Sequence, residues 1–533
     1  MTNPPDDADP TQTVHPTPPP PQAVRLPEQQ PFSPGRTVAT EQVQGHPAQV
    51  AEPPTQQIPA PQSGAGHALA GEPTALPANS TGSTRWTAQT TDARPRVPRD
   101  PGGRLTLIVL LLALVALGLS LLSVFSATRL SALDEATHID YAYRLSHGEL
   151  AYSGEPLSTY TTNAWACRGQ ANIPNLPACG SHAPYSAFPG SGLQYNAFHP
   201  PIYYAVTGPA ARALAALFGQ DFITMARSLG GVWLFAGMLA MYLTLRYWRV
   251  EWTWAVGGTL LLPLFPTLLH ASSIVTNDAP ALLCGVAALF LLGRSLIYRN
   301  DGWVLPVVIA GAVAATKGIS ATGLLAVAFM FFIIGIARWR RGNGRAAVAL
   351  IRNSVLIGLA VGVVQLIWSL IQSGRAVAGY VSPVSGVNTR KVVGSPFDEW
   401  VSTVLDGARL GSNYYLDPAV NSPYLIGWVL LITSIIAATG LIGLALFRRG
   451  SPEWFAGATL VLGTLMYPLI VQVQAYVDGD FFPGINNRYG TTLIPLAVGV
   501  LTLIVALKKL RVTSGVILTL GSIAVVTATL GVQ

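Results

Sequence analysis

Three ionisable side chains lie close together just after the first long apolar run. Asp134, Glu135 and His138 belong to the stretch LDEATHIDYAYRLSHGEL, which covers residues 133–150. In a helix, Asp134 and His138 are i,i+4 neighbours on one face, with Glu135 beside them. Carboxylates next to an imidazole are typical of a reaction centre with acid and base groups. The first turn of an interfacial helix gives the same pattern, because acids stabilise the positive end of a helix, and that alternative needs no chemistry.

Two further polar segments precede later apolar runs. One is HPPIYY, from His199 to Tyr204, and the other is the Asn277-Asp278 pair that ends SSIVTND. The prolines of HPPIYY predict an extended entry and its tyrosines suit a membrane interface, although an ordinary aromatic belt explains the tyrosines equally well. Asn277 and Asp278 precede an Ala-Pro pair and form a good helix cap, so capping alone also accounts for them.

Two cations lie at the ends of apolar runs. Lys317 is found in AATKGIS, and Arg488 precedes Tyr489 at the start of a late run. A lysine between apolar runs is costly unless it snorkels to the interface or pairs with an anion, and both alternatives remain open for Lys317. The planar guanidinium of Arg488 is suited to phosphate.

The composition excludes a soluble globular protein. Of the 533 residues, 50% are hydrophobic and only 11% are charged, and the mean hydropathy is +0.42. These values predict a polytopic membrane protein. The net charge of +7 does not indicate a nucleic-acid partner, because most basic residues lie in short clusters between apolar runs, as the positive-inside rule predicts.

Eleven apolar runs are candidate transmembrane helices, each of which needs about 20 residues. They cover residues 105–127, 225–247, 254–272, 279–298, 303–316, 319–337, 348–372, 424–447, 454–471, 489–507 and 512–530. The stretch 303–337 is long enough for two helices with Lys317 at the turn. A twelfth candidate, residues 201–218, fits better flat on the outer surface, because the basic clusters then all fall on the cytoplasmic side. We therefore expect an all-α fold with a long first extracytoplasmic loop that contains interfacial helices.

The first 103 residues differ from the rest of the chain. Residues 1–103 are rich in Pro, Gln, Thr and Ala, which predicts a disordered tail, and residues 104–533 form the transmembrane domain. The basic segment 94–104 predicts a cytoplasmic N-terminus, and the tail is too long and too polar for a signal peptide. It either binds partners or fills space. The Pro-rich tail and the Ala/Gly/Val-rich spans are typical of a high-GC actinobacterium.

Two features of the outer loops leave alternatives open. Cys167 and Cys179 share the first loop, and an oxidising compartment favours a disulfide between them over a metal pair or two free thiols. Residues 397–410 (FDEWVSTVLDGARL) have apolar positions close to helical spacing. They are either a lid over a lipid substrate or a plain interfacial helix.

The ordered set of landmarks resembles the GT-C superfamily of integral-membrane glycosyltransferases, which use polyprenyl-phosphate sugars. The landmarks are the acidic pair after the first span, the PPxYY segment, the ND turn, the TKG turn and the late RY, and they cover roughly residues 105–510. The chain is still more similar to an uncharacterised family of predicted bacterial membrane proteins with the same DE…H, PPxYY and RY landmarks. It departs from the better-known members because no large soluble domain follows Arg511, which leaves acceptor recognition open.

The resemblance implies transfer of a sugar from a polyprenyl-phosphate donor to a cell-envelope acceptor outside the plasma membrane. Asp134, with Glu135, is then the catalytic carboxylate that activates the acceptor hydroxyl in an inverting hexosyl or pentosyl transfer. Lys317, Arg488 and Tyr489 are expected to bind the donor phosphate. His138, His199 and Asp278 either position the acceptor or bind a divalent cation such as Mg or Mn, because some members of the superfamily need a metal and others do not.

Two other classes of function remain open. A transporter or lipid flippase would bury ionisable groups near the middle of the bilayer, whereas the predicted spans are almost free of them. A non-catalytic scaffold that recruits partners through its tail would not need acidic, histidine and basic groups on one face of the membrane. Both classes are less favoured than a glycosyltransferase.

Overall fold

The computed structural model describes residues 100–131, 134–170, 173–383, 390–391, 438–477, 480–482, 485 and 487–507. The predicted disordered tail falls almost entirely outside the described residues. So do the amphipathic segment 397–410, the last predicted span at 512–530 and the first part of the run at 424–447.

Within the described residues, six helices are apolar and long enough to cross a membrane. They are α1 (Gly102–Ser126), α5 (Phe222–Tyr247), α10 (Thr322–Arg340) with its leading turn η4 (Gly318–Ala321), α11 (Gly344–Ser373), α15 (Pro452–Val477), and α16 (Ile494–Leu507) with its leading turn η5 (Asn487–Leu493). Shorter apolar helices are α8 (Ala281–Leu296), α9 (Val304–Ala314) and α14 (Thr439–Leu446). A helix satisfies its own backbone groups, which an apolar segment in lipid requires. The chain is therefore a helical membrane protein.

The structure interrupts the run that was predicted as one span at 254–272. This run forms α6 (Trp252–Leu260), the turn η3 (Leu262–Leu264) and the short α7 (Pro266–Ala271). Pro263 and Pro266 explain the break, because proline has no backbone N–H and cannot continue a helix. The stretch 303–337, in contrast, divides into α9 and α10 with Lys317 at the turn, as its length predicts.

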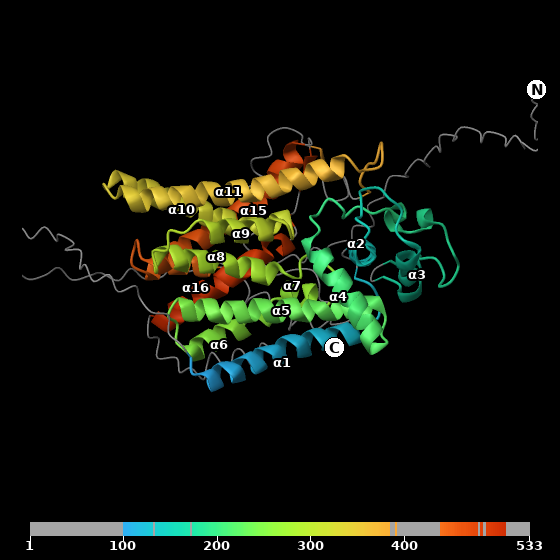
Figure 1. Cartoon of the computed structure of the whole chain (residues 1–533), viewed down its shortest axis with the longest axis horizontal. Coiled ribbons are helices and arrows are strands. Elements are labelled where there is room, and N and C mark those ends of the chain that lie inside the picture. The colour runs from blue at the N-terminus through green and yellow to red at the C-terminus, as the bar shows by residue number, and fades with distance from the viewer. Residues whose placement is uncertain are drawn as a thin grey trace, which may run out of the picture. The chain divides into compact units, whose positions relative to one another are not determined.

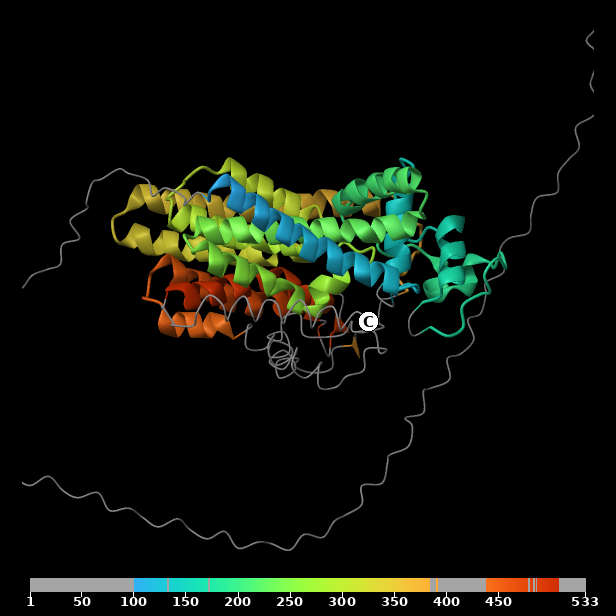
Figure 2. The same cartoon turned by 90° about the horizontal axis from the view of Figure 1, so that it is seen from below.

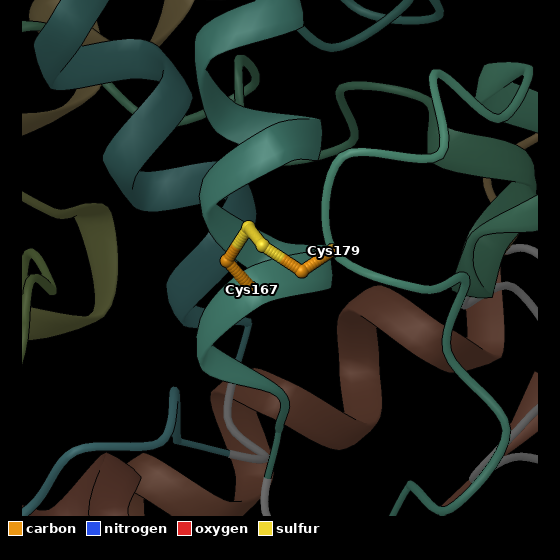
Figure 3. Close-up of a disulfide and its surroundings, with 2 residues drawn as sticks. All are labelled: Cys167 and Cys179. Carbon is orange, nitrogen blue, oxygen red and sulfur yellow. A yellow bond between two sulfur atoms is a disulfide. The ribbon is translucent and has the colours of Figure 1, made fainter.

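A compact polar region lies at one end of the long helices (Figures 1 and 2). It contains α2 (Glu135–Ser146), α3 (Thr159–Arg168), the turns η1 (Tyr185–Ala187) and η2 (Pro189–Gly192), and α4 (Ile202–Phe218). A disulfide joins Cys167, at the end of α3, to Cys179 in the following loop (Figure 3). Two short strands, β1 (Arg390–Lys391) and β2 (Asp480–Phe481), pair antiparallel.

The helix α4 is the segment predicted to lie flat on the outer surface. It is 17 residues long, carries Pro209 in its interior, and packs against both α2 and α5. Tyr203 and Tyr204 in its first turn are fully buried, so they do not form an aromatic belt at a membrane interface. They instead belong to a second apolar core that α4 shares with α2 and the start of α5.

The contact between α2 and α4 depends on a glycine, and we predict that Gly208→Ala destabilises the protein. A Cβ at Gly208 would overlap the backbone carbonyl of Ala142 in α2, whereas a Cβ at Gly362 on α11 would meet no atom. Overpacking of this kind costs about 1–3 kcal/mol, while alanine at an open helical position is neutral or stabilising. Thermal unfolding in detergent should show a lower midpoint for Gly208→Ala than for the wild type. The midpoint of the control Gly362→Ala should not be lower than that of the wild type. Equal midpoints would contradict this packing.

Candidate active site

Asp134 lies at the entrance of α2 with its carboxylate directed to two partners. The Tyr195 hydroxyl donates a hydrogen bond to Oδ1 at 3.0 Å, and Arg488 Nη2 lies 3.3 Å from Oδ2. The backbone φ of Asp134 is +58°, in the left-handed region that aspartate adopts more readily than most residues. A quarter of the side chain is exposed, at 25%. A substrate can therefore reach this carboxylate, which two neighbours orient.

Glu135, predicted as catalytic beside Asp134, takes a different position. Its side chain is 0% exposed and forms an ion pair with Arg227, in which Nε lies 2.7 Å from Oε1. Burial acts to raise the pKa of Glu135, but Arg227 and the backbone donors of Ser131 and Val275 outweigh it, so the pKa is lowered. The carboxylate has no access to a substrate. We therefore remove Glu135 from the catalytic group.

His138 and His199 form a stack of neutral rings beside Asp134. Their centroids are 6.3 Å apart, and His138 Nδ1 forms a 2.6 Å hydrogen bond with the Tyr204 hydroxyl. Burial is the main cause that lowers the pKa of His138, to about 4, and it lowers the pKa of His199 well below its ordinary value. Both rings are therefore uncharged at neutral pH and serve as hydrogen-bonding and stacking groups.

Asp278 and Lys317 form a third ion pair of the candidate site. Lys317 Nζ lies 2.6 Å from Asp278 Oδ1, and the two side chains are 5% and 13% exposed. Burial acts to raise the pKa of Asp278, but Lys317 and then Arg488 outweigh it and the pKa is lowered. Lys317 therefore does not snorkel freely. Its ammonium also lies 5.9 Å from the centre of the Tyr489 ring.

These charged groups converge on one place, although they come from distant parts of the chain. The charges of Asp134, Lys317, Asp278 and Arg488 all act on the ring of His138. Arg488 is 5.4 Å from the centre of the Tyr489 ring. The predicted residues of the outer face, other than Glu135, thus form one cluster.

A polar pocket lies beside this cluster. Its lining residues are Thr267, His270, Ala271, Ile274, Thr276, Asp278, Arg488 and Thr491. The hydroxyl of Thr267 is buried there and has no hydrogen-bond partner among the described residues. Hydroxyls, an imidazole and a guanidinium are groups that bind phosphate oxygens. The lining also contains the Asp278 carboxylate, but this charge is paired with Lys317, so the remaining groups leave the pocket suited to an anion.

The sequence analysis missed His270 and the threonines of this pocket. His270 was hidden in the run predicted as one span, although a histidine in an apolar run is itself a signal of function. The HPPIYY segment has a role that its sequence did not indicate. The hydroxyl of Tyr203 accepts a 3.1 Å hydrogen bond from the backbone N–H of Thr276, and so helps to shape the turn that carries Asp278.

Binding of a divalent cation, which the sequence left open as one of two roles for His138, His199 and Asp278, finds no ligand set among the described residues. Among the described residues, no three His, Cys, Asp or Glu side chains gather in a way that would hold a metal ion. The two carboxylates that face the cluster are paired with Arg488 and Lys317 instead.

Comparisons with known proteins give limited similarity. No family model matches the sequence, and no curated protein matches it. A solved structure of the oligosaccharyltransferase of Archaeoglobus fulgidus in the apo form is similar with a TM-score of 0.40 and 14% identity, covering 80% of this chain and 56% of that one. The archaeal oligosaccharyltransferase AglB of the same organism, in complex with an inhibitory peptide and a dolichol-phosphate, gives a TM-score of 0.39, 14% identity and coverage of 80% and 55%. The chain spans little more than half the length of these proteins.

We predict that His138 makes the protein less stable in acid. Its pKa is about 4 in the folded protein and about 6.5 in an unfolded chain, so between these values only the unfolded chain takes up the proton. The free energy of unfolding should therefore fall as the pH is lowered from 6.5 to 4, by on the order of 3 kcal/mol from this group.

Thermal unfolding from pH 7 to pH 4 tests this expectation. His138→Gln should lose less stability on acidification than the wild type, while His147→Gln, a change at the exposed histidine that follows the same helix, should follow the wild-type profile. Parallel profiles for all three proteins would show that His138 is not the group responsible.

Proposed function

We propose that the protein is a membrane glycosyltransferase of the GT-C kind that moves a sugar from a polyprenyl-phosphate donor to a hydroxyl of a cell-envelope acceptor. The observation that carries this proposal is the position of Asp134. It is a reachable carboxylate beside the cations Arg488 and Lys317 and a polar pocket, at the end of an apolar helix bundle. Transfer from a membrane-bound phosphate donor needs a base for the acceptor hydroxyl and cations for the leaving phosphate.

Asp134 acts as the general base in this mechanism. The acceptor hydroxyl attacks the anomeric carbon, its proton moves to the Asp134 carboxylate, and the bond from the anomeric carbon to the donor phosphate oxygen breaks. The electron pair of that bond leaves with the polyprenyl phosphate. Attack on the side opposite the leaving group inverts the anomeric configuration, as we propose for a hexosyl or pentosyl transfer. Tyr195 and Arg488 orient the carboxylate through its two oxygens.

The donor phosphate binds between Arg488, Lys317 and the pocket. Negative charge develops on the phosphate as it leaves, and preformed cations stabilise that charge most effectively in a partly buried site. Tyr489 lies against both cations and limits their movement. His270 and the pocket threonines supply further hydrogen-bonding groups for the phosphate oxygens. His138, His199 and Asp278 position the acceptor beside Asp134.

We place the active site outside the plasma membrane and the N-terminal tail in the cytoplasm. Asp278, Lys317 and Arg488 precede α8, α10 and α16, so the far ends of these helices lie away from the site. The basic clusters lie at such far ends, for example Arg338 and Arg340 in the last turn of α10. The positive-inside rule then assigns those ends to the cytoplasm. A disulfide in the polar region agrees with an oxidising compartment on the site's side.

Asp134→Asn should abolish sugar transfer in a protein that still folds. Asparagine keeps the shape and can still accept from Tyr195, but it cannot accept the acceptor proton, so the rate should fall by about 10²–10⁴-fold. Radiolabelled polyprenyl-phosphate sugars and a cell-envelope acceptor fraction measure the transfer by purified protein in nanodiscs.

Glu149→Gln is the matched control, because Glu149 is an exposed acid of the same polar region. It should keep wild-type transfer. Equal rates for Asp134→Asn and Glu149→Gln would remove Asp134 from the role of base. A wild type that binds donor but transfers none of the sugars would count against the proposed reaction with these acceptors.

Arg488→Gln should weaken binding of polyprenyl phosphate by about tenfold or more, because a charge-assisted hydrogen bond to the phosphate is lost. Direct binding to protein in nanodiscs measures this change without any need for an acceptor. Arg212→Gln, at an exposed arginine of α4 that bonds to the Ser146 carbonyl, is the control and should bind as the wild type does. Unchanged affinity in Arg488→Gln would place the donor phosphate elsewhere.

A further inference from the structure

The buried carboxylate of Glu135 is held by four hydrogen bonds from three segments of the chain. Arg227 donates from Nε to Oε1 and from Nη2 to Oε2, each at 2.7 Å. The backbone N–H of Ser131 donates to Oε2 at 2.7 Å, and the backbone N–H of Val275 donates to Oε1 at 3.0 Å. Every partner of Glu135 is a donor, so only an ionised carboxylate fits this place.

Arg227 extends the same network to the end of α1. Its Nη1 donates to the Ala127 carbonyl at 2.6 Å, and its Nη2 donates to the Arg129 carbonyl at 2.8 Å. The guanidinium therefore joins α5, the chain that leaves α1 and the first residue of α2. Through Val275, Glu135 also holds the turn that leads to Asp278.

We propose that the Glu135–Arg227 ion pair is the positioning device of the active site, which sets where Asp134 lies relative to the Asp278–Lys317 pair. Asp134 is the immediate neighbour of Glu135, and Asp278 follows Val275 by three residues. Asp134 is thus joined to the buried carboxylate by the backbone, and Asp278 by the hydrogen bond to Val275 and three residues of chain. The expected effect on catalysis rests on the proposed function, but the positioning of Asp134 can be tested without that function.

The chemistry of the pair explains why a salt bridge suits this task. A bidentate contact between guanidinium and carboxylate fixes both distance and orientation, which a packed apolar contact does not. Leaving either charge buried alone is strongly unfavourable, so the pair has one stable arrangement. The left-handed backbone conformation of Asp134 is then held by Glu135, whose side chain is fixed by its hydrogen bonds.

Arg227→Lys tests the positioning role, because it keeps the charge and removes the forked contact. We expect its kcat to fall at least tenfold while the Kd for polyprenyl phosphate changes less than twofold, since Lys317 and Arg488 come from other segments. Arg168→Lys is the matched control. Arg168 forms a partly exposed pair with Asp221 in the same region, and its variant should keep both constants.

A spectroscopic readout separates this proposal from the proposed function. 3-Fluorotyrosine at position 195 reports the hydrogen bond from Tyr195 to Asp134 by fluorine NMR. Asp134→Asn provides the reference, because it gives the fluorine chemical shift of Tyr195 when the contact with Asp134 is altered. Arg227→Lys should change the fluorine chemical shift from its wild-type value, while Arg168→Lys should leave it unchanged. This result supports positioning even if the wild type transfers no sugar, in which case only the proposed function fails.

Three outcomes would overturn the proposal. The first is a folded Arg227→Lys protein with wild-type resonance and wild-type kcat. The second is a parallel loss of kcat and donor affinity, because that is the behaviour of general structural damage. If Arg227→Lys does not fold, Glu135→Asp, which keeps the charge on a shorter side chain, replaces it with the same expected results. The third outcome is that neither variant folds, because the pair is then a folding requirement and the positioning role is rejected.

Discussion

Pairing of buried charge is the constraint on which the polar end of this protein depends. At the candidate site, Glu135, Asp278 and Asp134 each have a cation partner, and their side chains are 0%, 13% and 25% exposed. An ionised group taken out of water must be paired, and the geometry of the pair becomes stricter as burial increases. The buried pair can therefore hold the structure, and the most exposed carboxylate is the one that a substrate can reach.

Much of the site could be predicted from the sequence, because polar residues at the ends of apolar runs must lie at one of the two membrane surfaces. Asp278, Lys317 and Arg488 each stand just before a helix of the bundle, and helices that cross a membrane place such residues at its two surfaces. The structure brings these three together with Asp134 and His138. The sequence could not show which of two adjacent acids was available, because the partner of Glu135 lies 92 residues away.

The residues that sequence reasoning missed lie inside runs interpreted only by their hydropathy. Arg227 stood near the start of a predicted span, and an arginine in an apolar helix requires a partner, which indicates an acid without deciding between Asp134 and Glu135. His270 stood in a run that contains Pro263 and Pro266, and a search for helix breaks would have placed it at a chain reversal instead of in a continuous helix. An average of hydropathy over a run hides single charged residues and prolines, although these residues indicate where a helix needs a partner or is interrupted.

The distribution of paired charges also bears on the choice between an enzyme and a coupled transporter. A transporter that moves protons or sodium ions keeps ionisable groups in the bundle near mid-membrane. Among the described residues, the ion pairs that involve the long apolar helices stand near their ends: Arg227 near the start of α5, and Arg246 with Asp100 at its other end. At the polar end each cation of the proposed phosphate site is already paired with a carboxylate. Arg488 lies beside the Asp134 carboxylate, so in the proposed reaction one arginine contacts both the base and the donor phosphate. Ion pairs at the ends of the helices favour group transfer at the membrane surface over ion-coupled transport.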